Sequence, residues 1–387
     1  MKKKIAILGS TGSIGKTLLN IIKKDEKSFE VVLLTADKNY KLLLLQAKKF
    51  KVKNVILSNK HTFNKYKFVF IKNKIKVFNN FQNIDKILKT KIDYTMSAIV
   101  GIDGLNPTIS LIKFSKKIAI ANKESIICAW NLIKNELKRY KTNFVPVDSE
   151  HFSIWYSLNN NKKKNIDKIY LTASGGPLLN IKKKFFKNLN VNQITKHPNW
   201  NMGKKISVDS STLMNKVLEV IEAKKIFQLN YNQISILIHP KSYLHALVKF
   251  NDGIIKMIAH DTTMKIPIFN TIYENGEMKL KSKKLDINKL NNLNLKRVNV
   301  TKFPFVKILN YLPSKDSLFE TILVSINDEL VNLFLKKKIS FLDISRILLK
   351  TIFFKEFKKY KFLKPKNVNE IVKLNKYVRL KINSMCI

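Results

Sequence analysis

The chain has 387 residues, enough for two or three domains at roughly 100–200 residues per domain. A hydrophobic fraction of 45% is ordinary for a globular protein, so a buried core is expected. Cys128 and Cys386 are too few for a disulfide framework, and no stretch of about 18 apolar residues predicts a membrane span. We therefore expect a cytoplasmic protein without a membrane partner.

The formal net charge of +46 has two interpretations. Binding to nucleic acid or an anionic membrane is one, and a proteome biased toward lysine by an AT-rich genome is the other. Only four basic residues are arginine, the residue that nucleic-acid surfaces favour, and the lysines are dispersed along the chain. We expect no specific nucleic-acid partner, although the positive field would steer an anionic substrate.

The first 150 residues alternate between short β-rich runs and longer amphipathic segments. The predicted strands are Ile5–Leu8, Val31–Thr35, Asn54–Leu57, Tyr94–Ser97, Ile118–Ala121 and Phe144–Val147. Segments such as Thr17–Lys24 and Tyr40–Phe50 are predicted helices between them. This alternation predicts βαβ units and an α/β domain with a mostly parallel sheet.

A different pattern begins at the predicted strand Lys168–Leu171. A helix is expected after Ser210-Ser211, with serine as its N-cap, and antiparallel strands are expected within residues 234–258. Residues 261–313 are poorly patterned and are expected to bridge to another unit. From Lys315 onward an apolar stripe at helical spacing predicts helices.

A glycine-rich turn, Gly9-Ser-Thr-Gly12-Ser-Ile-Gly15, follows the first predicted strand and opens the first helix. Glycines there permit a tight turn, and the helix N-terminus supplies N–H groups for a pyrophosphate. In this context the pattern predicts a dinucleotide site rather than a plain turn. After the second strand, Asp37 favours NAD whereas Lys38 and Asn39 favour NADP, so spacing leaves the nucleotide open.

Two carboxylate clusters suggest a hard divalent cation. Asp148 and Glu150 follow a predicted strand, and their spacing lets both converge on one ion, although for this triplet alone a solvated loop is the favoured interpretation. Asn215 and Glu219 are four apart and share a helix face, with Lys216 beside them. A carboxylate, an amide and an ammonium together suit a metal and a phosphate, while a surface helix is the alternative.

Further polar clusters follow other strands. Asn122-Lys123-Glu124-Ser125 comes after the strand that ends at Ala121, and Ser174-Gly-Gly is a candidate anion loop. Ligands of open α/β sheets bind at the carboxyl ends of strands, so we expect these clusters at one edge. His197, next to Pro198, is either a core histidine or a substrate contact.

Seven ordered motifs carry a family resemblance over about residues 1–260. They are Gly9–Gly15, Ala121–Ser125, Pro146–His151, Ser174–Pro177, His197–Gly203, Lys205–Ser210 and Met214–Glu219. Together they resemble the signature runs of the 1-deoxy-D-xylulose 5-phosphate reductoisomerase family. The resemblance implies three domains, usually within a homodimer: a Rossmann-like NADPH-binding domain (1–150), an α+β catalytic domain (151–275), and, after a linker (276–312), a C-terminal helical domain (313–387).

The resemblance also implies residue roles. The residues implied for the cation (Mg²⁺, Mn²⁺ or Co²⁺) are Asp148, Glu150 and Glu219. Those implied for the substrate phosphate are Ser174, Ser210, Asn215 and Lys216, and those for the rest of the substrate are Lys123, Ser149, Glu150, His197 and Glu219. The residues implied around NADPH are Thr11, Gly12, Ser13, Ile14, Asp37, Lys38, Asn39, Asn122, Glu124 and Gly203. Trp200 would lie on a loop that closes over the substrate, and Lys123, Glu150 and His197 would be catalytic.

The implied reaction converts 1-deoxy-D-xylulose 5-phosphate to 2-C-methyl-D-erythritol 4-phosphate in non-mevalonate isoprenoid biosynthesis. The carbon skeleton rearranges while a metal polarises the carbonyl, and NADPH then reduces the resulting aldehyde. Three departures from the family's usual pattern stand out: Asp37 stands where the family commonly has a small residue, Val217 stands at a customary glycine, and Lys265 lies near a position that is often arginine.

Two other functions remain open at this point. A semialdehyde dehydrogenase would need an activated cysteine, but Cys128 lies in an apolar run that is typical of a core. A non-enzymatic polyanion binder would use the net charge and would have no use for the acidic residues.

Overall fold

The computed structural model describes residues 1–158, 165–200, 202–273 and 278–386. The chain divides into two compact units. The first unit consists of Met1–Ser125, Leu132–Asp148 and Met264–Lys281. The second unit consists of Ile126–Asn131, Ser149–Thr263 and Ser282–Ile387. The boundary expected between a catalytic domain and a linker, at 275–276, and Asn201 of the seven motifs lie outside the described residues.

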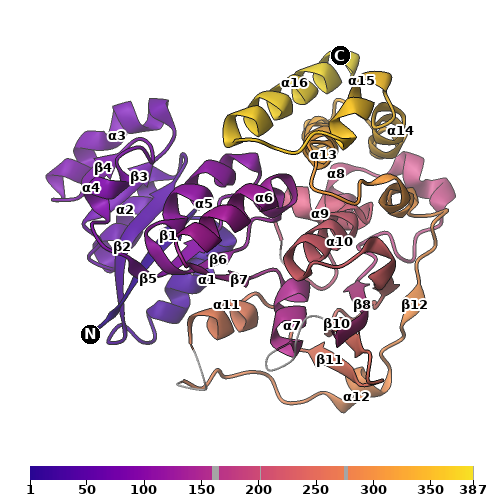
Figure 1. The fold of residues 1–387 in the computed structure, drawn as a ribbon, viewed down its shortest axis with the longest axis horizontal. Helices are drawn as coiled ribbons and strands as arrows, with labels where there is room; N and C mark the ends of the chain where they lie inside the picture. Colours follow the sequence, from indigo (N-terminus) through magenta and orange to yellow (C-terminus); the bar gives the residue numbers. More distant parts are fainter. Residues whose placement is uncertain (159–164, 201, 274–277, 387) are drawn as a thin grey trace. The chain divides into compact units, whose positions relative to one another are not determined.

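The first unit is built on a seven-stranded parallel sheet (Figure 1). Its strands are β1 (Lys3–Leu8), β2 (Phe29–Ala36), β3 (Asn54–Leu57), β4 (Lys76–Phe78), β5 (Ile92–Ser97), β6 (Ser115–Ile120) and β7 (Asn143–Pro146). They are ordered β4-β3-β2-β1-β5-β6-β7, and every neighbouring pair is parallel. This is the doubly wound arrangement of dinucleotide-binding domains, so the predicted Rossmann-like fold is confirmed.

Helices cover both faces of this sheet. They are α1 (Ser13–Ile22), α2 (Tyr40–Lys49), α3 (Lys60–Lys72), α4 (Ile84–Ile87), a short 3₁₀ turn η1 (Ile102–Gly104), α5 (Leu105–Ile112) and α11 (Lys265–Ile272), while α6 (Lys123–Arg139) contributes residues to both units. Ile5 and Ile7 of β1 enter a core cluster with α1, whereas Leu8 enters a second cluster with Leu111 of α5. Burial on both faces explains the continuous apolar runs of these strands.

Three helices that follow strands are capped by an asparagine side chain. The side-chain oxygens of Asn39, Asn59 and Asn122 accept hydrogen bonds from main-chain N–H groups at the starts of α2, α3 and α6, at 3.2, 3.0 and 2.9 Å. These bonds satisfy donors that a helix leaves without an intrahelical partner. The strand-to-helix turns at the carboxyl edge of the sheet are therefore locally specified.

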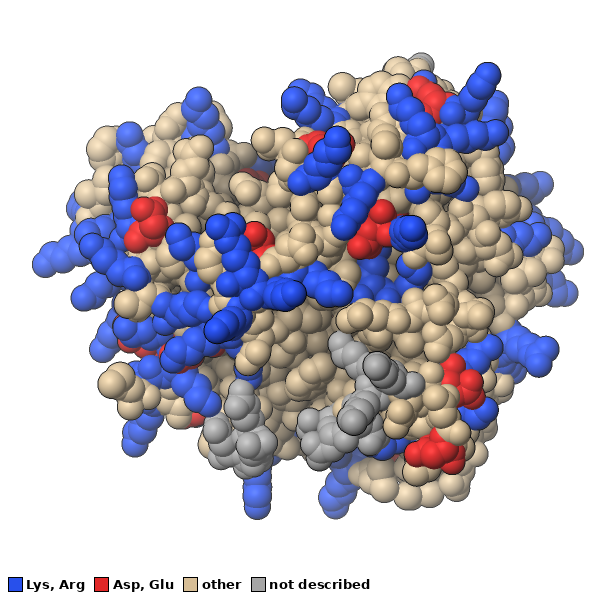
Figure 2. All heavy atoms as spheres, in the orientation of Figure 1, with Lys and Arg blue, Asp and Glu red and all other residues tan. Residues whose placement is uncertain are grey.

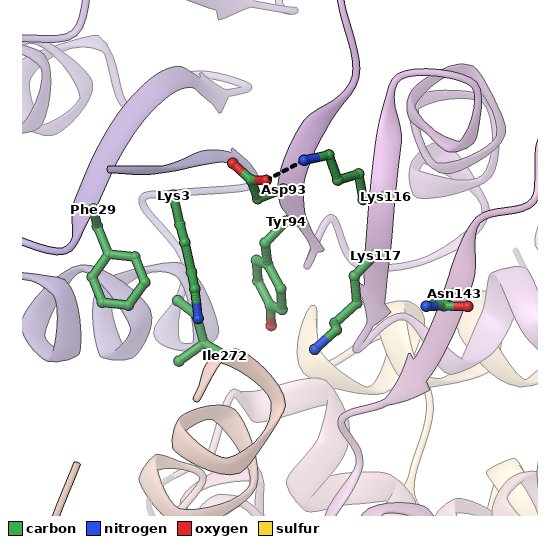
Figure 3. Close-up of a pocket in the computed structure, with 8 residues that line it drawn as sticks. All are labelled: Lys3, Phe29, Asp93, Tyr94, Lys116, Lys117, Asn143 and Ile272. Carbon is green, nitrogen blue, oxygen red and sulfur yellow. Dashed lines mark hydrogen bonds and ion pairs between the residues drawn. The ribbon is translucent and has the colours of Figure 1, made fainter. Parts of the chain in front are cut away.

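Helix α11 belongs to the first unit although its sequence was expected only to bridge. The Thr271 hydroxyl lies 2.8 Å from the Tyr94 hydroxyl, and the Tyr273 hydroxyl donates to Asp25 at 2.9 Å. Beside this contact is a cavity of ≈ 210 Å³ at the amino ends of β1, β5 and β6 (Figure 3). Asp93 and Lys116 pair across 2.8 Å at its rim. It lies at the end of the strands opposite to the predicted ligand edge.

The second unit contains a five-stranded sheet ordered β11-β10-β8-β9-β12. Its strands are β8 (Ile166–Ala173), β9 (Ile234–Ile238), β10 (Leu244–Phe250), β11 (Ile255–Ala259) and β12 (Lys296–Arg297). The β8–β9 pair is parallel and the other pairs are antiparallel. The predicted antiparallel strands are therefore present, and helix α7 (Ser149–Ser157) packs against β10 and β11.

The remaining helical segments of this unit follow the sheet or lie between its strands. They are η3 (Lys183–Asn188), α8 (Val191–Thr195), α9 (Lys204–Ser211), α10 (Met214–Phe227), η4 (Tyr231–Gln233), α12 (Ile287–Asn291), η5 (Pro304–Tyr311), α13 (Phe319–Leu335), α14 (Phe341–Thr351), α15 (Lys355–Lys358), η6 (Lys359–Lys361) and α16 (Val368–Cys386). The predicted C-terminal helical region is confirmed, with α13 packed against α14 and α16 (Figure 1).

The predicted serine cap before α10 is wrong. Ser210 and Ser211 end α9, and α10 begins at Met214 after Leu213, whose backbone is left-handed at φ 58°. The Ser211 hydroxyl bonds back along helix α9 instead, since its Oγ donates to the Ser207 carbonyl at 2.8 Å. Two helices joined by a tight corner thus replace the single capped helix.

Candidate active site

The glycine-rich turn lies between β1 and α1. The Gly9 N–H donates to the Thr35 hydroxyl at 2.9 Å, which ties the turn to the end of β2. A side chain at Gly15 would meet the Ser10 Cα at 2.5 Å, so only glycine lets α1 approach the turn this closely. Helix α1 begins after Gly12 without a side-chain cap. Thr11, Gly12, Ser13 and Ile14 are all partly or fully solvent-accessible at this helix N-terminus, as phosphate recognition requires.

The polar residues after β2 are all exposed and so are accessible to a cofactor. Asp37 accepts a hydrogen bond from the Ser58 hydroxyl at 3.2 Å, which holds its carboxylate toward β3. Asn39 caps α2 and so has a structural role of its own. Lys38 supplies a cation next to both, so a 2′-phosphate would meet one positive and one negative side chain here.

The Asn122–Ser125 cluster follows β6, at the same edge. The Asn122 amide donates to the carbonyls of Ile99 and of Gly101, the latter at 2.8 Å, and thereby fastens the loop after β5. Lys123 begins α6, and its ammonium lies 2.7 Å from the Asp148 carboxylate. Glu124 is buried in the same first turn. The four clusters expected at this edge follow four parallel strands, β1, β2, β6 and β7.

In the second unit, a buried group of charged side chains lies between α7 and α10. The Lys216 ammonium is 2.6 Å from Glu150 Oε1 and also contacts Glu219 Oε2. The two glutamates offer carboxylate oxygens within 4.8 Å of each other. Lys216 and Glu219 side chains are 5% and 1% exposed, so the cluster is shielded from water. Two carboxylates converging on one point are the hard oxygen ligands that Mg²⁺ or Mn²⁺ prefers.

Further bonds orient these carboxylates. The Ser149 hydroxyl donates to Glu150 Oε2 at 2.6 Å, and the Asn215 amide donates to Glu219 Oε1. Asn215 and Glu219 thus share a helix face, as their spacing predicts. Burial by itself lowers the pKa of Lys216, but the charges of Glu150 and Glu219 outweigh it and raise that pKa above its usual value. Asp148 directly precedes α7, two residues from Glu150.

A buried histidine behind this cluster was missed by the sequence analysis. His151 Nε2 lies 2.9 Å from the main-chain oxygen of Glu219, and its Nδ1 lies 3.4 Å from Glu222. Both side chains are inaccessible to solvent. The contact holds α7 on α10 and so sets Glu150 opposite Glu219. The sequence did offer a signal: His151 directly follows Glu150, and Glu222 lies one helical turn after Glu219.

Ser174 and His197 meet in the second unit. The Ser174 hydroxyl lies 2.9 Å from His197 Nε2, while His197 Nδ1 accepts the N–H groups of Asn199 and Trp200 at 3.1 and 3.0 Å. Because Nδ1 accepts, the neutral ring carries its proton on Nε2 and donates to Ser174. Burial lowers the pKa of His197 to about 4, so the ring is neutral at pH 7. His197 is therefore a hydrogen-bonded member of a polar loop and not a core histidine.

The Ser174 loop packs on the end of α9. A side chain at Gly176 would lie 3.0 Å from the main-chain oxygen of Ser210, so the two segments touch. Ser174 and Ser210 thus flank the corner from which Asn215 and Lys216 of α10 follow. The loop after His197 is fastened by Asn199, whose amide donates to the Pro240 carbonyl at 2.6 Å. Gly203, exposed at the start of α9, ends this loop.

Cys128 is 1% exposed within α6. A thiol without access to solvent or substrate is a poor nucleophile, so the structure disfavours cysteine-based dehydrogenase chemistry. Together, a doubly wound sheet with a glycine-rich first turn and a carboxylate-lined centre define an oxidoreductase of the dinucleotide-dependent class that uses a divalent cation.

Comparisons with known proteins agree with this class. Residues 5–130 match a family model described as 1-deoxy-D-xylulose 5-phosphate reductoisomerase, and residues 144–227 and 261–381 match models of its C-terminal domains. A relative of the same description from Pelagibacter ubique (strain HTCC1062) is 62% identical over 100% of both chains. Another, from Sulfurihydrogenibium sp. (strain YO3AOP1), is 38% identical over 90% of both.

Solved structures are also similar along the full chain. A reductoisomerase from Zymomonas mobilis in complex with NADPH has a TM-score of 0.87 at 28% identity, covering 100% of this chain and 99% of that one. A second, in complex with NADPH, fosmidomycin and magnesium, has a TM-score of 0.90 at 29% identity, with 99% and 98% coverage. This chain belongs to the 1-deoxy-D-xylulose 5-phosphate reductoisomerase family, which confirms the resemblance and the expected enzyme class.

Proposed function

We propose that this chain converts 1-deoxy-D-xylulose 5-phosphate to 2-C-methyl-D-erythritol 4-phosphate for isoprenoid biosynthesis, with NADPH as reductant and one divalent cation. The observation that carries the proposal is the convergence of Glu150 and Glu219 on one positively charged point beside Ser149 and Asn215. That arrangement suits cation chemistry on a small polar substrate, and family membership supplies the substrate's identity.

The cation ligands are Asp148, Glu150 and Glu219. Asp148 is two residues from Glu150 in the chain, so the bend from β7 into α7 carries both carboxylates. Mg²⁺, Mn²⁺ and Co²⁺ all accept such oxygen ligands. When bound, the cation polarises the substrate carbonyl as a Lewis acid. His151 and Ser149 keep the two glutamates in place through the contacts described above.

The substrate phosphate is assigned to Ser174, Ser210, Asn215 and Lys216. Two hydroxyls, an amide and an ammonium are donors of the kind that phosphate oxygens accept. Gly176 permits the contact between the Ser174 loop and Ser210, and α10 follows this corner directly. Binding energy from the phosphate, remote from the reacting carbons, then serves to position the substrate.

Lys123, Ser149 and His197 contact the substrate's other polar groups. His197, neutral at pH 7, donates or accepts a hydrogen bond without adding charge. The residues that would hold NADPH are Thr11, Gly12, Ser13, Ile14, Asp37, Lys38, Asn39, Asn122, Glu124 and Gly203, and the bound cofactor would supply the hydride for the reduction. Asn122 supports the cofactor site indirectly, because its amide holds the loop that follows β5.

The chain acts as a cytoplasmic homodimer with the three domains expected from the family. Among the described residues, no helix has the length and apolar character needed to cross a membrane. Lysines are spread over the face seen in Figure 2. This spread supports electrostatic attraction of anionic ligands rather than one nucleic-acid surface.

The test is turnover by purified protein. With substrate and Mn²⁺, the protein should oxidise NADPH faster than NADH, followed through the absorbance of the reduced nicotinamide. Glu219→Gln should abolish this turnover and weaken Mn²⁺ binding. Glu356→Gln, which removes a surface carboxylate paired with Lys381, is the matched control and should behave like the wild type. Normal activity of Glu219→Gln would refute the cation site.

A further inference from the structure

Each carboxylate assigned to the cation contacts a lysine. Lys216 contacts Glu150 and Glu219 in the second unit, and in the first unit Lys123 lies 2.7 Å from Asp148. These two lysines are also the ones assigned to the substrate. The same ammonium groups therefore serve two partners, the carboxylates and the substrate, that they cannot contact fully at one time.

Lys216 shows the conflict most clearly. Its ammonium contacts one oxygen of each glutamate, Glu150 Oε1 and Glu219 Oε2, whereas the other oxygens are held by Ser149 and Asn215. The oxygens that face Lys216 are thus the ones available to a cation from that side. A divalent ion and an ammonium cannot occupy one position between the same two oxygens, because like charges repel at such short range.

We propose that Lys216 is an exchangeable internal cation: a divalent ion displaces its ammonium from Glu150 and Glu219, and the displaced ammonium then binds the substrate phosphate. The inference rests on the proposed function for the identity of both ligands. Lys216 lies in the first turn of α10, next to the corner formed by Ser210, so a change of its side-chain rotamer redirects the charge without moving the backbone.

The exchange makes cation and phosphate binding cooperative. Phosphate binding without the cation must break the Lys216 contacts and leave two buried carboxylates facing each other, which is costly. With the cation in place, those contacts are already broken. By thermodynamic linkage, each ligand must increase the affinity for the other by the same factor. The lysine also offsets one of the two negative charges of the carboxylates while no divalent ion is bound.

The first experiment measures Mn²⁺ affinity by electron paramagnetic resonance of free Mn²⁺. Lys216→Met and Lys216→Gln remove the competing charge, so both should bind Mn²⁺ more tightly than the wild type, on the order of tenfold. Lys225→Met is the matched control. Lys225, on the same helix, is equally buried between two carboxylates, Asp316 at 2.6 Å and Glu320 at 3.1 Å, and its loss should leave Mn²⁺ affinity unchanged.

The second experiment measures inorganic phosphate binding by calorimetry with and without Mg²⁺. Wild-type protein should bind phosphate several-fold more tightly with Mg²⁺. Lys216→Gln should bind phosphate weakly and without any effect of Mg²⁺. If Lys216→Gln keeps the full Mg²⁺ effect, a direct contact between ion and phosphate produces the coupling, and the exchange is refuted.

The outcomes separate this inference from the proposed function. If Glu219→Gln binds Mn²⁺ as tightly as the wild type, the cation site itself is refuted. Weakened affinity in Glu219→Gln, together with equal or weaker Mn²⁺ binding in both Lys216 variants, would keep the site and overturn the exchange. Folding of each variant is checked by its circular dichroism spectrum and thermal transition.

Discussion

His151 bonds through Nε2 to the main-chain oxygen of Glu219, 68 residues further along the chain, at a distance of 2.9 Å. This contact joins α7 to α10 behind the carboxylates and involves no carboxylate of the cation site itself. Its other nitrogen faces Glu222 at 3.4 Å. We therefore expect the spacing of the two glutamates to depend on this buried histidine, which contacts the main chain of Glu219.

Replacing His151 should lower both stability and cation affinity. His151→Ala removes a partner of the buried Glu222 carboxylate and leaves a cavity, so we expect a loss of about 2–4 kcal/mol in the free energy of unfolding. Mn²⁺ binding should weaken because Glu150 loses its fixed position. Urea denaturation and Mn²⁺ titration check both. Tyr156→Phe, at an exposed position on α7, should change neither, and wild-type Mn²⁺ affinity in His151→Ala would contradict the positioning role.

His197 should make stability depend on pH. Burial lowers its pKa to about 4 from an ordinary value of 6.5, so the unfolded state binds the proton more readily between those values. The contribution of neutral His197 to the free energy of unfolding is therefore fully present above about pH 6.5, and it is lost as the pH falls toward 4. The free energy of unfolding, measured by urea denaturation between pH 4 and 7, should depend less steeply on pH in His197→Gln than in the wild type. The exposed His61→Gln should keep the wild-type slope; identical slopes in all three proteins would contradict the prediction.

Gly176 should tolerate alanine less well than Gly253. Both have left-handed backbones, at φ 63° and 86°, so alanine costs roughly 1–2 kcal/mol of conformational energy at either position. Only at Gly176 would the new Cβ press on Ser210, whereas nothing lies within 4 Å at Gly253. Gly176→Ala should therefore be the less stable variant and should raise KM for the substrate by moving the Ser174 loop. Equal KM values in the two variants would argue against a phosphate site at this corner.

Asn327 should stabilise the helix that carries Ser210. Its amide donates to the buried Asp209 carboxylate of α9 at 2.9 Å, and Lys205 pairs with the same carboxylate at 2.9 Å. Asn327→Leu removes one hydrogen bond to a buried charge, a loss of about 1–3 kcal/mol in the free energy of unfolding. Thermal and urea denaturation provide the measurement. Asn332→Leu, which removes a longer bond of 3.3 Å to Glu329, should cost less.

Much of the first unit was predictable because its signals are local. Alternating apolar runs and helices predict a parallel sheet, and the glycine-rich turn after β1 predicts its ligand edge. The polar clusters after β2, β6 and β7 follow from the same reasoning, since parallel strands end at one edge. Missed features were those with no local signal, such as α11, which joins the first unit through Tyr94 and Asp25.

Local patterns misled at one point. Ser210-Ser211 before an apolar run resembles a helix start, yet both residues end α9, and the Ser211 hydroxyl donates to a carbonyl one turn earlier. A serine hydroxyl can cap the start of a helix or bond back to a carbonyl one turn earlier within a helix, so residue type alone does not decide between the two.

By itself, the sequence determined the fold class, the dinucleotide turn and, through seven ordered motifs, the family. These are encoded in residue type and spacing over short stretches. Only the tertiary structure decided that Glu150 and Glu219 share one lysine, and that His151 contacts the main chain of Glu219. Residues 68 positions apart come together through burial of apolar surface around them, and spacing along the chain carries no information about such a contact.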